Sequence, residues 1–368
     1  YTSQGRDVNL DVKRVVGYRH WCNKLFNALR YAMMNLGDSY KAPEELSPKD
    51  MPLSCKWILS RLNNTIKSTV AAMDEYQFSP ATTAIYSFWQ YDLCDVFIEL
   101  VKPVMASDDE KEKKQTRDTL WACLEVGLRL LHPFMPFLTE ELWQRLPKAE
   151  AYAKEFPSIT IAPYPTCSEE FLFADLENKM TYSSVVTNKI RSLRQNYGLT
   201  SNKQRPDVWL LCNDQATLDK VGPVSAYVAT LSTSNKVTCV LSSAEIPEGC
   251  GVAPVDSQVT AYVLLAGLID PAAEIKRLEK KVQAGAQAEK KLRDKMNMPD
   301  YAKTPQKFKD ADNDKLKDLA TEKAGLEEAI EGFKKILAAP PAPKKKEEAA
   351  KAPAPKKEEE IAAPKKEE

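Results

Sequence analysis

The sequence predicts a mainly α-helical protein with one small α/β part, and three observations support this fold class. Residues 1–150 carry apolar side chains every three or four positions, which is the spacing of amphipathic helices. Between residues 158 and 270 the pattern changes to short runs rich in β-branched residues. Residues 272–337 alternate apolar steps of three and four, as coiled coils do. We therefore expect an antiparallel helical bundle, a small α/β subdomain and a C-terminal antiparallel coiled-coil hairpin.

Helix start and stop signals divide the first 150 residues into separate helices. Gly37-Asp38 ends the first predicted helix, and Ser79-Pro80 begins a third with a cap residue followed by proline at the first helical position. Asp108-Asp109 begins a fourth helix, which we expect to stop at His132 through Pro136. Thr139-Glu140-Glu141 then caps a short helix. Successive helices joined by short loops pack as an antiparallel bundle.

Short β-branched runs predict the strands of the α/β part, with helices between them. The runs are Ile159–Ile161, Val208–Leu211, Val237–Val240 and Val259–Leu265. The helix predicted between the first two runs lies in a stretch without acidic residues, 178–206, and carries Ile190-Arg191-Ser192-Leu193-Arg194. A solvated basic helix face and an RNA contact are equally good interpretations of these cations.

The predicted hairpin has two helical arms followed by a tail of different composition. The apolar positions are Ile275, Leu278, Val282, Leu292 and Met296 in the first arm, and Leu316, Leu319, Leu326, Ile330, Phe333 and Leu337 in the second. Asn297-Met298-Pro299 ends the first arm. From Ala338 to Glu368 the chain repeats Pro, Ala, Lys and Glu in blocks with one large aliphatic residue, Ile361, so we expect a disordered tail.

Length and composition describe a globular chain without net charge. Its 368 residues can bury two or three cores, and 52 basic residues balance 52 acidic ones, so nucleic-acid affinity would have to come from local patches. No run approaches the roughly 18 apolar residues of a membrane span, so we expect no membrane contact and a cytoplasmic location. The eight cysteines stand singly and only two histidines occur, which predicts reduced core thiols, no metal site and a structural role for His132.

Basic and aromatic residues are segregated from acidic ones on the first predicted helix. Val12–Gly37 contains no acidic residue. It carries Lys13, Arg14, Arg19, Lys24 and Arg30 among Tyr18, Trp21, Phe26 and Tyr31. This combination suits a surface that meets phosphates and stacked bases, whereas solvated cations around an apolar inner face are the alternative. A second predicted helix, 53–73, carries Lys56, Arg61 and Lys67 without an acid from 53 to 72, and the two helices would form one electropositive face.

The residues in several stretches resemble the valyl-tRNA synthetase family. Residues 4–11, Gln-Gly-Arg-Asp-Val-Asn-Leu-Asp, and 17–28, Gly-Tyr-Arg-His-Trp-Cys-Asn-Lys-Leu-Phe-Asn-Ala, are similar to the junction between that family's catalytic and anticodon-binding domains. Trp57–Asn63, Tyr86–Trp89 with Cys94-Asp95, and Leu131–Trp143 resemble its anticodon-binding domain. The last stretch recurs in related class I synthetases for branched aliphatic amino acids, so the valine assignment rests on the first 30 residues and the C-terminal arm.

The resemblance implies a domain order and a set of partners. Residues 1–12 would end the catalytic domain, 13–156 would form the anticodon-binding bundle, 157–270 the small α/β subdomain, 271–337 the tRNA-binding coiled-coil arm, and 338–368 the tail. Such a chain would bind tRNA(Val) and position it for catalytic and editing domains upstream in the same polypeptide. In the full-length family enzyme, ATP and Mg²⁺ serve the attachment of valine to tRNA(Val), and the editing domain hydrolyses mischarged threonine.

Candidate tRNA-binding residues lie in two places. On the bundle they are Arg19, Asn23, Lys24, Asn27, Arg30 and Arg61. On the arm they are Lys276, Arg277, Lys280, Lys281, Lys290, Lys291 and Arg293. Residues 271–295 hold eight Lys or Arg against four acids, an excess that a purely structural zipper would less often show. The family resemblance supports the arm further, since Asp270–Arg277 is similar to the start of the family's tRNA-binding arm.

The chain contains no recognisable set of residues for ATP-dependent catalysis. The His-x-Gly-His and Lys-Met-Ser-Lys-Ser motifs of class I synthetases do not occur in it, and neither do the P-loop, GxGxxG and GxSxG motifs. We therefore expect no catalytic residue, no cofactor bound by this chain and no activation of valine by the chain alone. A non-catalytic coiled-coil scaffold and a tRNA-binding accessory protein are the alternative functions.

Overall fold

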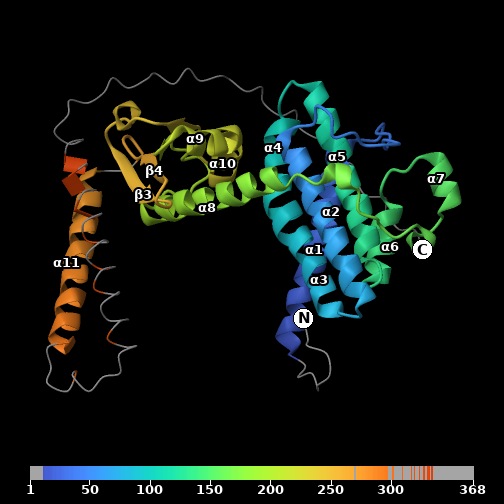
Figure 1. Ribbon diagram of the computed structural model, residues 1–368, viewed down its shortest axis with the longest axis horizontal. Helices are drawn as coiled ribbons and strands as arrows, with labels where there is room; N and C mark the ends of the chain where they lie inside the picture. Colours follow the sequence, from blue (N-terminus) through green and yellow to red (C-terminus); the bar gives the residue numbers. More distant parts are fainter. Residues whose placement is uncertain are drawn as a thin grey trace, which may run out of the picture.

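The computed structural model describes residues 11–268 and 271–296, together with single residues between 301 and 334. Figure 1 shows an upright bundle of helices, a long helix, α8, that runs from the bundle to a small sheet, and α11 beyond that sheet. The predicted fold, mainly α with a small α/β part, is confirmed. The predicted tail, the hairpin turn and most of the second arm lie outside the described residues, so the coiled coil stays a prediction.

The bundle is built from amphipathic helices whose apolar sides meet in one core. Its elements are α1 (Val12–Leu36), α2 (Leu53–Asp74), α3 (Phe78–Ser87), a π-helix (Phe88–Phe97), α4 (Ile98–Met105), α5 (Glu110–Leu131), α6 (Pro136–Gln144) and α7 (Glu150–Glu155). Four large aromatic side chains, Phe88, Trp89, Phe97 and Trp143, are fully buried in it. The backbone stays helical from α3 through the π-helix into α4, so these three elements form one continuous helix.

The predicted helix ends are correct where a local cap determines them and wrong where it does not. The Asp109 side chain caps α5 by accepting from the backbone N–H groups of residues 111 and 112, and Gly37, with φ 76°, ends α1. The third helix begins at Phe78 after Gln77, without a side-chain cap, so Ser79 lies inside it. Likewise α6 begins at Pro136, so Thr139 is an interior residue and not a cap.

The α/β part holds a four-stranded sheet in the order β2-β1-β4-β3. Its elements are β1 (Val208–Cys212), α9 (Gln215–Val221), α10 (Ser225–Ser232), β2 (Val237–Val240), β3 (Cys250–Pro254) and β4 (Val259–Leu264). Strands β1 and β2 are parallel, as a connection through α9 and α10 requires, whereas β4 pairs antiparallel with both β1 and β3. The helices α8, α9 and α10 pack against this sheet.

One predicted strand is a helical turn instead. Ile159–Ile161 forms a 3-10 helix, and a second such turn covers Glu169–Phe171. The backbone N–H of Ile159 and the Ser158 hydroxyl both donate to the Glu140 carboxylate on α6, at 3.0 and 2.9 Å. This anchor and the capping side chain of Ser158 fold the segment onto α6, away from the sheet.

Helix α8 (Ala174–Asn196) belongs to two hydrophobic cores. Leu176 and Met180, near its start, pack in the bundle core, whereas Val186 and Ile190 pack in a second core with the sheet. The second core also contains Ile275 and Leu278 of α11 (Pro271–Met296) and Phe333. One helix therefore joins the bundle to the sheet and to the base of α11.

A single carboxylate, that of Glu177, attaches the start of α8 to α2. It accepts hydrogen bonds from the Ser60 hydroxyl, from Nη1 of Arg61 at 3.1 Å and from Nδ2 of Asn64 at 2.6 Å. The Ser60 hydroxyl in turn accepts from the backbone N–H of Phe173, the residue before α8. The Glu177 side chain is only 14% exposed, so its charge requires these donors.

Replacing Glu177 by alanine should lower the free energy of unfolding by about 2 kcal/mol or more, because three donors lose their acceptor in a largely buried place. Arg61 would keep its second partner, Asp92, which limits the loss. Urea unfolding followed by circular dichroism measures the change. Glu155→Ala is the control, since Glu155 is exposed at the end of α7. Equal midpoints for the two variants would show that the network around Glu177 contributes nothing to stability.

Candidate nucleic-acid interface

Four of the six bundle candidates lie on the exposed side of α1. Arg19, Asn23, Asn27 and Arg30 are all exposed, and their spacing of three to four residues places them along one side of the helix. The opposite side of α1 buries Leu25, Ala28, Leu29, Ala32 and Leu36 in the bundle core. Every residue from 11 to 20 is exposed, and in Figure 1 this end of α1 extends past the rest of the bundle.

The other two bundle candidates are engaged by carboxylates. Nζ of Lys24 lies 2.7 Å from Asp95 in an exposed ion pair. The Arg61 guanidinium lies 3.0 Å from Asp92 and 3.1 Å from Glu177. Burial by itself would lower the pKa of Arg61, but the two carboxylates outweigh it and raise this pKa. Arg61 therefore has a structural role in the fold, whatever else it contacts.

Helix α2 contributes more to the core than to a basic surface. It buries twelve of its residues, and it packs against α3, α5, the π-helix and α8. Lys56 and Arg61 are half-buried and Lys67 is exposed. The exposed cations of the bundle's candidate surface are thus mainly those of α1.

Beside this row of α1 residues lies an open aromatic pocket of about 530 Å³. It is lined by Arg14, Gly17, Tyr18 and Trp21 of α1, by Tyr86 of α3 and by Tyr91 of the π-helix. The Trp21 and Tyr86 ring centroids lie 5.3 Å apart with the planes tilted by 30°, and the Tyr86 and Tyr91 rings meet edge to face at 6.1 Å. The Tyr91 side is open to solvent, since this residue is 56% exposed.

The pocket has the features of a site for a flat, polar ring. The indole N–H of Trp21 is buried, and no hydrogen-bond partner for it exists among the described residues. A buried donor without a partner is unfavourable. Gly17 leaves space above the rings, because a Cβ at this position would meet nothing within 4 Å. Aromatic faces beside an arginine are typical of surfaces that stack unpaired bases.

Part of this pocket could be anticipated from the sequence. Arg14, Tyr18 and Trp21 belong to the segregated basic and aromatic segment, and Tyr86 lies in a stretch with family resemblance. Tyr91 was not a candidate, and no local pattern distinguishes it. It reaches the pocket because the chain turns through a π-helix there, and π-helical turns often occur at functional sites.

The arm candidates are placed on α11, with their side chains directed mostly to solvent. Lys276, Lys280, Lys281, Lys290, Lys291 and Arg293 are exposed, whereas Arg277 is half-buried over the Tyr197 ring at 5.8 Å. Arg293 also pairs with Glu289 at 2.6 Å. Along part of α11, Val282 and Gly285 line a groove together with Leu319, Lys323 and Leu326 of the following segment.

His132 and two of the thiols have surroundings that suit a structural role. Nδ1 of His132 lies 2.7 Å from the Thr139 hydroxyl, and its Nε2 lies 3.2 Å from the Thr160 hydroxyl, which agrees with a structural role. Burial raises the pKa of Cys94 to about 11 and that of Cys250 to about 12, so these thiols stay protonated. Among the described residues no cluster could hold a metal ion. No described helix is long and apolar enough to cross a membrane.

Comparison with known proteins agrees with this geometry. Residues 55–208 match a family model described as the anticodon-binding domain of tRNA ligase. The chain is 43% identical over 347 residues to a valine–tRNA ligase of Takifugu rubripes and 41% identical over 345 residues to one of Homo sapiens. It is 38% identical over 327 residues to a mitochondrial valine–tRNA ligase of Arabidopsis thaliana.

These alignments cover 92%, 92% and 88% of the chain, but only 28%, 27% and 29% of the respective relatives. The chain thus spans less than a third of the length of the proteins that it matches. The similarity nevertheless runs through both hydrophobic cores. The chain therefore belongs to the valyl-tRNA synthetase family, and it corresponds to the part of those proteins that contains the anticodon-binding domain.

Proposed function

We propose that this chain is the tRNA-binding part of a valine–tRNA ligase and that it holds the anticodon end of tRNA(Val). The observation that carries the proposal is the aromatic pocket beside the exposed row of Arg19, Asn23, Asn27 and Arg30. The matching family model, which is named for anticodon binding, and the names of the relatives support it.

In this proposal the pocket binds a base of the tRNA, and the exposed α1 residues bind the sugar–phosphate backbone beside it. An unpaired base of the anticodon loop stacks on the rings of Trp21 and Tyr91. Arg19 and Arg30 meet phosphates of the loop, while Asn23 and Asn27 supply amide groups that can donate and accept hydrogen bonds. Binding at this end positions the distant acceptor end for catalysis, which is a contribution of orientation and not of chemistry.

The remaining assignments belong to the same proposal. The catalytic and editing activities of a complete valine–tRNA ligase, with its ATP and Mg²⁺, would be supplied by domains upstream in the same polypeptide. The domain boundaries at residues 12, 156, 270 and 337 and the cytoplasmic location stay predictions, and the relatives include a ligase named mitochondrial. A scaffold function without RNA is not favoured, because it accounts for neither the pocket nor the family match.

Replacing Arg19 and Arg30 together by glutamine should flatten the salt dependence of tRNA(Val) binding. Each lost phosphate contact in a single-stranded region lowers the slope of log K against log salt by roughly 0.7, so two contacts give about 1.4. Fluorescence titration at several salt concentrations measures the slope. Lys49→Gln/Lys111→Gln removes the same charge from exposed positions outside the pocket and the α1 row and should leave the slope unchanged. Equal slopes for the two double variants would show that Arg19 and Arg30 are only solvated and do not contact phosphates.

Replacing Tyr91 by alanine should weaken binding of tRNA(Val) about tenfold or more, since one base stack contributes about 1–3 kcal/mol. The free energy of unfolding should change little, because the side chain is 56% exposed. Phe137→Ala is the matched control, as this α6 aromatic is 91% exposed and distant in sequence from the pocket. A tRNA with altered anticodon bases should bind the Tyr91 variant and the unchanged protein alike. If Tyr91→Ala binds the cognate tRNA with unchanged affinity, no base occupies the pocket.

Replacing Lys280, Lys281, Lys290 and Lys291 by glutamine tests the arm. All four side chains are exposed, and the buried Ile275 and Leu278 that anchor α11 are untouched, so the helix should persist in circular dichroism. If the arm meets the tRNA backbone, the slope of log K against log salt should fall by about 3, from roughly 0.7–0.9 per contact. An undiminished slope would show that the arm cations are only solvated.

A further inference from the structure

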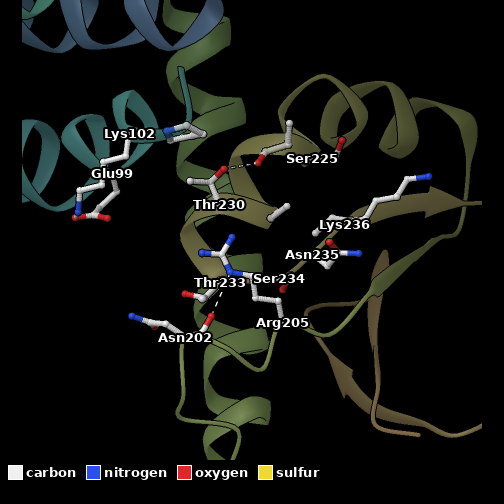
Figure 2. A pocket seen from close by; sticks show the side chains of 14 residues that line it. Glu99, Lys102, Asn202, Arg205, Ser225, Thr230, Thr233, Ser234, Asn235 and Lys236 are labelled. Atoms are coloured by element: carbon white, nitrogen blue, oxygen red, sulfur yellow. Dashed lines mark hydrogen bonds and ion pairs between the residues drawn. The ribbon is translucent and has the colours of Figure 1, made fainter. Parts of the chain in front are cut away.

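A cleft, separate from the aromatic pocket, lies where the bundle meets the sheet. It has a volume of about 860 Å³ and is enclosed by α4, the 202–205 segment, α10 and the start of β2. Ten of the 14 residues that line it are polar or charged, and Figure 2 shows Lys102 on the α4 side and Arg205 and Lys236 on the other walls. The cleft is therefore a polar, basic hollow between two packed parts of the chain.

A buried arginine without a carboxylate partner among the described residues binds the backbone next to two of the cleft's walls. The Arg194 residue of α8 is 6% exposed, and it donates to the carbonyl oxygens of Ser232 at 2.5 Å, Gln204 at 3.0 Å and Ser201 at 3.3 Å. Its Nε has no hydrogen-bond partner in the described structure. These carbonyl groups are next in sequence to the lining residues Asn202, Arg205 and Thr233, so Arg194 links the two backbone segments that carry them.

The surrounding charges do not neutralise this arginine. Burial, and after it the charges of Arg191 and Arg205, lower the pKa of Arg194. Arg191 itself donates to the Leu231 carbonyl at 2.9 Å, so both α8 arginines face the C-terminal end of α10 and gain some compensation from its dipole. The carbonyl groups at the C-terminal end of α10 carry only partial negative charges. Arg191, Arg194 and Arg205 therefore remain a positively charged group.

The acidic groups near the cleft already have partners of their own. Glu99 pairs with Lys102 at 2.6 Å, and Asp207 accepts from Nδ2 of Asn235 at 2.7 Å. Neither Arg205 nor Lys236 makes an ion pair within the described part of the chain, and both side chains are exposed. The cleft thus presents two cations, Arg205 and Lys236, that have no counter-ion within the described part of the chain.

One residue on the cleft wall has an unfavourable backbone conformation. Thr233 adopts φ 56° in the left-handed region, which is rare for a β-branched residue, and glycine or asparagine usually ends a helix in this way. Residues kept in such conformations cluster at ligand sites. Here the conformation places a hydroxyl-bearing side chain on the wall between Thr230 and Asn235.

We infer that this cleft binds the sugar–phosphate backbone of the RNA that the bundle holds. Arg205 and Lys236 would meet phosphate oxygens, and the hydroxyl and amide groups of Thr230, Thr233 and Asn202 would donate to phosphate or ribose oxygens. The inference rests on the proposed function and adds to it a second contact, on the other side of the junction. A strand held between the two parts would also fix their relative orientation.

The two surfaces are spaced for one RNA. Tyr91 of the aromatic pocket and Lys102 of the cleft lie on the same continuous helix, eleven residues apart in the numbering. At ~1.5 Å per residue this is roughly 16 Å along the axis, a distance that a few nucleotides cover. A backbone that leaves the pocket along this helix can therefore reach the cleft.

The test is the salt dependence of tRNA(Val) binding by Arg205→Gln/Lys236→Gln. Loss of two phosphate contacts should lower the slope of log K against log salt by about 1.4–1.8, from roughly 0.7–0.9 each. The control Lys49→Gln/Lys111→Gln should keep the slope, and Arg205→Lys/Lys236→Arg should restore it. Urea unfolding of each variant confirms that the fold is retained.

Three outcomes would overturn the inference, and they separate it from the proposed function. If Arg205→Gln/Lys236→Gln keeps the slope while Arg19→Gln/Arg30→Gln lowers it, the cleft is not an RNA contact but the proposed function stands. If the unchanged protein does not bind tRNA, both fail. If inorganic phosphate alone shifts the NMR signals of the cleft residues while the tRNA slope is unaffected, the cleft is a small-anion site and not an RNA site.

Discussion

The hydrogen bonds that Glu177 accepts from three neighbouring residues of α2 are the constraint on which the rest of the structure depends. They fix the first turn of α8 against the bundle, and the same helix then enters the core beneath the sheet. Because a helix is a rigid connector over this length, the position of its first turn determines where the sheet, α10 and the base of α11 lie relative to the bundle. Tyr227 adds a second link, since its hydroxyl accepts from the backbone N–H of Ser54 at 3.1 Å. The cleft between α4 and α10 therefore depends on how α8 is held against the bundle, whereas the aromatic pocket lies within the bundle itself.

The cations of this neutral chain divide into two groups by their surroundings. Arg61 pairs with carboxylates, Arg194 donates to carbonyl groups and Arg129 donates to the Pro163 carbonyl. All three arginines therefore stabilise contacts between segments that are distant in sequence. Arg19, Arg30, Arg205 and Lys236 have exposed side chains, for which no ion pair is found within the described part of the chain. An exposed cation retains its hydration and is free to pair with a phosphate. A cation that already pairs with a buried carboxylate cannot leave without destabilising the fold. Basic composition alone does not distinguish the groups.

A binding function that consists of positioning suits this architecture. The aromatic pocket and the cleft lie along one uninterrupted helix that includes the π-helix, and the buried Phe88, Trp89 and Phe97 hold it in the bundle core. Surfaces on a rigid element keep their spacing when a ligand binds, so little binding energy is spent on ordering them.

The sequence by itself determined the features that local physics controls. Apolar periodicity identified the helices, Asp109 and Gly37 marked helix ends through their own side chain or backbone freedom, and three of the four strands followed from β-branched runs. The segregation of basic and aromatic residues on α1 is also visible in the sequence. The resemblance of several stretches to valyl-tRNA synthetases indicates the family. Long-range contacts decided the rest. Ile159–Ile161 is a helical turn because Glu140 binds it, and Cys250–Pro254 is a strand although it contains Gly251 and Pro254, because it pairs with β4 at the sheet edge.

Long-range contacts also determine the candidate site, and the sequence does not show them. Nothing near Arg61 in sequence shows that Asp92 and Glu177 will engage it, and nothing near Arg194 shows that it will lie buried under a cleft. Tyr91 joins Trp21 in one pocket although seventy residues separate them. A local pattern records which residues are basic or aromatic and which side of a helix they share. Whether a cation is free, paired or buried depends on partners that only the folded chain brings within a few ångströms, and tertiary packing therefore decided which of the predicted residues can meet a ligand.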